Sequence, residues 1–163
     1  KIASGYATAI FNGDFVKMVA AGVIEKDTGT ATLTTIGIFM GCKYTDPTTG
    51  QLTFNQYFPA STAADDIMAY VITDPDVVFL MQADGAIAQT ALGSNFDVIQ
   101  TAGTTSIGNS KNAVDADSTA TTNTLPLRIY DFYDGPNSTI GDTYTDALFK
   151  FNVGHAYRNT TGV

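Results

Sequence analysis

The side chains that could carry out acid–base, nucleophilic or metal chemistry are few. His155 is the only histidine and Cys42 the only cysteine among 163 residues. A histidine-rich metal site is excluded, and a Ser-His-Asp or Cys-His arrangement would have to use His155, which no nucleophile motif accompanies. There is no glycine-rich phosphate loop. We therefore expect no enzyme activity and no cofactor. Cys42 lies in an apolar run, so we expect it to be a small buried residue and not a nucleophile.

Aspartates occur in pairs that could offer oxygen ligands to calcium. The pairs are Asp65-Asp66, Asp74 with Asp76, Asp115 with Asp117, and Asp131 with Asp134. None belongs to an EF-hand loop, and aspartate often caps turns by accepting hydrogen bonds from nearby backbone N–H groups. We expect turn caps at these positions and no bound metal.

Composition favours an all-β chain with many turns. Fifteen aspartates stand against one glutamate, and aspartate favours turns where glutamate favours helices. The net charge of −8 argues against a nucleic-acid groove, which needs a basic stripe. No apolar run approaches the ~20 residues of a membrane helix, so no membrane contact is expected. The chain begins at Lys1 without an initiator methionine, and we expect a segment before it.

The segment 67–85 is expected to organise the fold. Two short apolar runs, Ile67–Ile72 and Val77–Met81, flank a breaker formed by Asp74, Pro75 and Asp76. Two strands around a tight connection form a hairpin in this interpretation. Neither run alternates between apolar and polar residues, which predicts that both faces of the hairpin are covered.

Further strands follow from alternation of apolar and polar residues. Gly37 and Gly41 predict a bulge or sharp bend in their strand. A short helix is expected over 86–92. We expect one β-rich domain over 1–163, with a small β-barrel over 1–58 and a second β-rich portion with long loops over 59–163. The expected strands are 14–20, 23–25, 33–42, 52–58, 95–100, 125–133 and 147–153.

Several residues could contact another molecule. The aromatic cluster of Phe54, Tyr57 and Phe58 suits either core packing or a subunit contact. Residues 101–124 are nearly all small or polar, which predicts a loop laid on the body or on a neighbour. The candidate interface comprises Phe54, Tyr57, Phe58, Ile107, Val114, His155, Tyr157 and Arg158.

Three early runs together resemble the small β-barrel signature of tailed-bacteriophage virion proteins. These runs are Asn12–Met18, Gly22–Ile24 and Ile36–Cys42. Later runs are similar to a widespread set of phage structural proteins; they are 68–71 with 74–76, 82–85, 106–110, 125–129 and 157–163. The resemblance implies a capsid-associated component of the virion.

On this resemblance we expect a decoration or cement protein on the outer face of the capsid. It would bridge neighbouring subunits of the major capsid protein, as a homo-trimer or other homo-oligomer. One alternative is a tail, tail-fibre or head-fibre component of the virion. Another is an extracellular carbohydrate- or calcium-binding β-domain.

Overall fold

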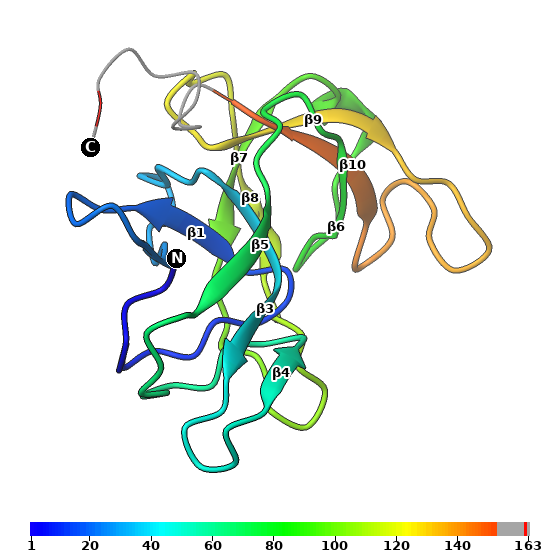
Figure 1. Cartoon of the computed structure of the whole chain (residues 1–163). Coiled ribbons are helices and arrows are strands. Elements are labelled where there is room, and N and C mark those ends of the chain that lie inside the picture. The colour runs from blue at the N-terminus through cyan, green and yellow to red at the C-terminus, as the bar shows by residue number, and fades with distance from the viewer. Residues whose placement is uncertain (153–161, 163) are drawn as a thin grey trace.

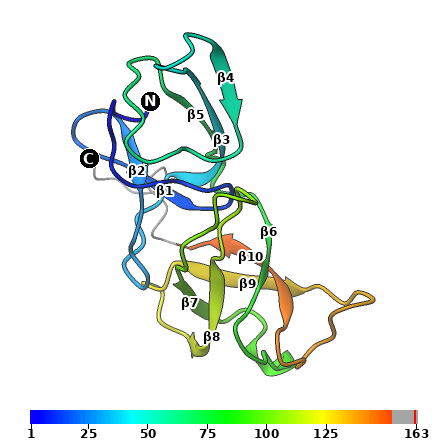
Figure 2. The same ribbon diagram turned by 90° about the horizontal axis from the view of Figure 1, so that it is seen from below.

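The computed structural model describes residues 1–152 and 162. These residues form ten β-strands in two five-stranded sheets, which lie side by side (Figures 1 and 2). Every strand pairing is antiparallel. In this part of the chain the one helical element is the 3-10 turn η1, Gln89–Ala91, which lies within the expected range 86–92. The all-β class with long loops is confirmed.

The first sheet is built around β3, Gly37–Thr45, which pairs with three other strands. Its order is β2-β1-β3-β4, and β5 pairs with the opposite edge of β3 from β4. The other strands are β1 (Phe15–Met18), β2 (Ile24–Lys26), β4 (Leu52–Asn55) and β5 (Met68–Ile72). The barrel expected over 1–58 is wrong. These strands form an open sheet, which is completed by β5 from farther along the chain, so the two sheets divide between β5 and β6 (Phe79–Gln82).

The expected irregularity of β3 is confirmed at its glycines. Pairing with β5 shifts register between Phe39 and Gly41, where one extra residue is inserted. Gly37 has a φ of 153°, and a Cβ placed there would lie 1.9 Å from the carbonyl oxygen of Ile72. Only glycine therefore allows β5 to approach β3 this closely.

The second sheet has the order β6-β10-β9-β7-β8. Its two edge strands are β6 and β8. They approach each other where Ala83, which directly follows β6, forms one parallel bridge with Val114 of β8. The expectation that all of 101–124 is loop is wrong, because residues 113–120 pair with β7. Small and polar residues have a low intrinsic preference for strands, and here pairing with β7 stabilises the extended conformation. The strands are β6 (Phe79–Gln82), β7 (Asn95–Ile99), β8 (Ala113–Ala120), β9 (Leu127–Phe132) and β10 (Asp146–Phe151).

The expected hairpin over 67–85 is also wrong, although both of its strands exist. β5 pairs with β3 and β6 pairs with β10, so the two strands belong to different sheets. The turn itself is present, since the Asp76 N–H donates to Asp74 Oδ1 at 2.9 Å. This link carries the chain from one sheet to the other (Figure 2).

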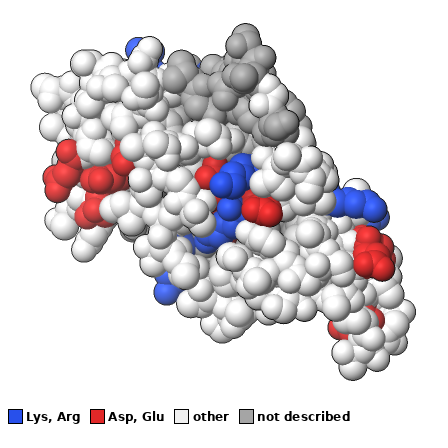
Figure 3. Space-filling model, turned by 90° about the vertical axis from the view of Figure 1, so that its left-hand side faces the viewer, with Lys and Arg blue, Asp and Glu red and all other residues white. Residues whose placement is uncertain are grey.

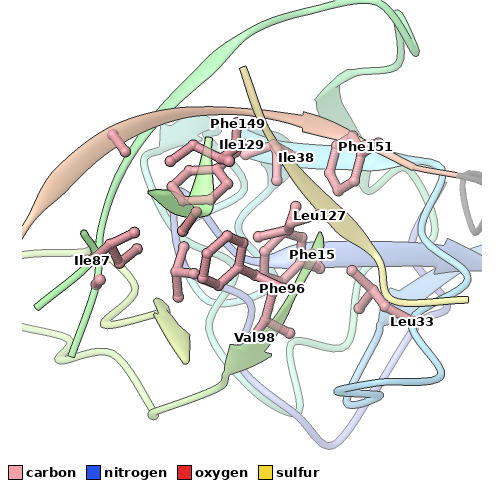
Figure 4. Packing of buried hydrophobic residues seen from close by; sticks show 14 residues of the cluster. Phe15, Leu33, Ile38, Ile87, Phe96, Val98, Leu127, Ile129, Phe149 and Phe151 are labelled. Carbon is pink, nitrogen blue, oxygen red and sulfur yellow. The ribbon is translucent and has the colours of Figure 1, made fainter. Parts of the chain in front are cut away.

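The two sheets share apolar packing through β1. The side chain of Phe15 is buried in the core of the second sheet, whereas its neighbour Val16 is buried in the core of the first. Ile38, directly opposite Phe15 on β3, also enters the second core. The Phe15 ring meets Phe151 edge-on at 6.0 Å between centroids (Figure 4). Phe149 and Phe151 face this core, as their alternation in the sequence predicts.

A buried ion pair fixes the turn that precedes β1. Asp14 Oδ2 accepts hydrogen bonds from the Phe11 N–H and from Lys26 Nζ, the latter at 2.9 Å. The amide of Asn112 donates to Asp14 Oδ1 and to the Gly13 carbonyl. The loop before β8 is thereby attached to the first sheet, so that β1 is held from both sides.

Replacing Phe15 by alanine is expected to lower the free energy of unfolding by about 3–5 kcal/mol, because the change opens a cavity in the second core. Urea unfolding followed by far-ultraviolet circular dichroism measures it. Phe54→Ala is the matched control: Phe54 is 65% exposed, and its loss should change stability by no more than about 0.5 kcal/mol. Equal effects of the two substitutions would contradict the packing described.

Candidate contact surface

The outer side of the first sheet carries large apolar side chains that are open to solvent. Leu52 and Phe54 of β4 are 58% and 65% exposed, and Met68 and Tyr70 of β5 are 40% and 46% exposed. We call these four residues the apolar face. Isolated exposed apolar residues are ordinary on proteins, but a contiguous group of them often marks a contact site.

Strand register places the four residues on one face of the sheet, two on either side of β3. Lys43 of β3 lies opposite both Phe54 and Met68, so the three side chains form one row across the sheet. Residues directly opposite each other on neighbouring strands share a face. The next row pairs Leu52 with Thr45. The alternate residues of the same strands, including Cys42 and Tyr44, point into the core of the first sheet.

Two of the candidate interface residues predicted from the sequence are exposed, namely Phe54 and Ile107. Ile107 is 65% exposed and lies in the loop beside β4. The amide of Gln56 donates to Asn109 Oδ1, and a Cβ added at Gly108 would lie 3.5 Å from the Gln56 side chain. Ile107 therefore lies in a loop that is attached to the segment directly after β4.

Two other candidates are wrong, because they belong to the interior. Phe58 is fully buried in the core of the first sheet, where its backbone pairs with Ile10. Val114 is fully buried in the second core. Tyr57 is half-buried and stacks on Phe11 at 5.5 Å between ring centroids, which leaves little of it for a partner. The remaining candidates lie outside the described residues; they are His155, Tyr157 and Arg158.

Leu52, Met68 and Tyr70 were not among the candidates. Alternation over 52–58 places Leu52 and Phe54 on one face, but it does not say whether that face is the inner or the outer one. The unbroken apolar run 67–72 predicts burial on both sides, yet Met68 and Tyr70 are exposed. An apolar strand whose outer face is open to solvent indicates a surface that is available to a partner.

Of the paired aspartates, Asp74 caps a turn, as expected, whereas Asp115, Asp117 and Asp131 lie within strands β8 and β9. Asp66 accepts hydrogen bonds from the Thr45 hydroxyl and N–H, and these bonds lower the pKa of its carboxyl. Asp115 accepts from the Asp117 N–H, and Asp131 accepts from the Phe132 N–H. Within residues 1–152 and 162, no group of three or more His, Cys, Asp or Glu side chains is placed to hold a metal ion.

The Cys42 thiol lies in the core of the first sheet, 3.6 Å from the Tyr57 carbonyl oxygen. Burial raises the pKa of this thiol to about 11. The expectation of a small buried residue is confirmed, since a thiol must be exposed and ionised to react well.

No family model, curated protein or solved structure matches this chain. In the described part of the chain, no helix is long and apolar enough to cross a membrane.

Cys42 is expected to resist thiol reagents while the protein is folded. At pH 8 the buried group remains protonated, because its pKa is about 11, so reaction with an aromatic disulfide reagent should proceed at least about a hundredfold more slowly than in urea. The absorbance of the released thiolate measures the rate. Equally fast modification in the folded and unfolded protein would contradict the burial of this side chain.

Proposed function

We propose that this chain is a capsid decoration protein, which binds the outer surface of a phage head and bridges neighbouring subunits of the major capsid protein. The observation that carries the proposal is the apolar face. Such a protein acts by burying surface against its neighbours, so it requires an exposed area that favours contact and a fold stiff enough to present it.

The chemistry of the apolar face suits a protein interface. Aromatic side chains and methionine are enriched in the cores of such interfaces. Phe54, Tyr70 and Met68 belong to these types and lie on one side of one sheet. Lys43 in the same row offers a cation, which an acidic side chain of the capsid protein would pair with at the contact.

The face of the molecule drawn in Figure 3 offers uncharged area for a contact. In Figure 3 the acidic side chains gather in separate groups, and wide areas between them carry no charge. A stable interface covers on the order of 800 Å² on each partner. Net charge of −8 keeps free copies apart and soluble before they attach.

A homo-oligomer with closed symmetry would suit this role. A trimer would match the threefold positions of an icosahedral shell. A head decoration protein and a tail component differ in copy number. Hundreds of copies per particle support the head, whereas a few dozen or fewer support the tail alternative. Band intensities of purified particles, relative to the major shell protein, measure this number.

Removing the apolar face is expected to reduce attachment to the head. Heads that lack the protein are mixed with the purified chain, and bound protein is measured after sedimentation. The double variant Leu52→Ser/Phe54→Ser should lose at least about tenfold in affinity, since buried anchors of an interface each contribute on the order of 1–2 kcal/mol or more.

The matched control is Leu80→Ser/Tyr144→Ser, because these side chains are 55% and 59% exposed but lie outside the first sheet. It should bind as the unaltered chain does. Full occupancy by the Leu52→Ser/Phe54→Ser variant would show that the contact lies elsewhere. Failure of the unaltered chain to bind heads at all would overturn the proposed function.

A further inference from the structure

The outer side of the second sheet carries two cations that no described carboxylate neutralises. Arg128 of β9 and Lys150 of β10 lie directly opposite each other across the strand pair. Among residues 1–152 and 162 the only ion pair joins Lys26 and Asp14. Like charges opposite each other in a sheet lower stability, so an anion bound between them would relieve their repulsion.

The two cations line a cavity. It has a volume of about 330 Å³, within the range of small-molecule sites. Its walls are formed by Leu92, Gly93, Arg128, Ile129, Tyr130 and Lys150. Two of these contribute exposed apolar surface, since Leu92 is 46% and Tyr130 60% exposed. The cavity therefore joins a cationic part to an apolar part.

Contacts within the cavity hold both cations beside the open space. The Lys150 ammonium lies 4.7 Å from the centroid of the Tyr130 ring, which positions it without neutralising its charge. The guanidinium of Arg128 reaches over Gly93, where an added Cβ would lie 3.9 Å from Nη2. Gly93 has a φ of +82° in the turn after η1, and its lack of a side chain leaves the space beside Arg128 open.

We propose that this cavity binds a small monocarboxylic acid with an aromatic or apolar body. The planar guanidinium of Arg128 matches a carboxylate with two parallel hydrogen bonds, and Lys150 adds a second positive charge. The body of the acid packs between Leu92 and the Tyr130 ring. The site shares no residue with the apolar face of the first sheet. Binding of the acid is therefore tested independently of attachment to heads.

Benzoate is the probe, because it combines one carboxylate with one apolar ring. Titration of the isotope-labelled full chain, followed by amide nuclear magnetic resonance, should give saturable shifts at Gly93, Ile129, Tyr130 and Lys150. Arg128→Gln and Lys150→Gln should each weaken binding roughly tenfold or more, since each removes a charge-assisted contact. Lys111→Gln removes an exposed lysine elsewhere and should leave the affinity unchanged.

Two further ligands test the chemistry. Benzamide has the shape of benzoate without the charge and should bind at least about tenfold more weakly. Inorganic phosphate has charge without an apolar body and should not shift these amides. Equal binding of benzamide would reduce the site to an apolar cleft, and equal binding of phosphate would reduce it to a general anion patch. No saturable shift up to about 10 mM benzoate would also overturn the proposal.

Discussion

Phe15 and Ile38 are opposite each other in the first sheet, and both side chains are buried among the residues of the second. These two side chains join the core of the first sheet to that of the second. β1 therefore has two buried faces, because Val16 on its other side belongs to the first core. A strand buried on both faces cannot slip by one residue without exchanging the contents of the two cores. The sheets are therefore held in one relative orientation.

That constraint decides which surfaces remain for other molecules. The inner side of each sheet is buried by packing, so contacts with other molecules must use the outer sides or the loops. On the first sheet the outer side carries exposed apolar side chains on either side of Lys43. On the second it carries Arg128 and Lys150 beside an open cavity. Rigid strands position both surfaces, which lowers the entropy lost when a partner binds.

Local features of the fold were predictable from the sequence, and its long-range pairing was not. Alternation placed Phe149 and Phe151 in the core, and Gly37 and Gly41 indicated the irregular β3, since both signals depend on a few neighbouring residues. The hairpin over 67–85 failed because a turn signal does not determine which strands pair beyond it. β8 was missed because small polar residues become a strand only beside β7. The apolar face could be seen only when the register of β3, β4 and β5 was known.

The shared packing at Phe15 makes the two sheets one cooperative unit. Differential scanning calorimetry of the full chain tests it directly, by comparing the calorimetric enthalpy of unfolding with the van't Hoff enthalpy. We expect a single transition in which the two enthalpies agree. Two separate transitions, or a van't Hoff enthalpy near half the calorimetric one, would show that the sheets unfold independently and would contradict it.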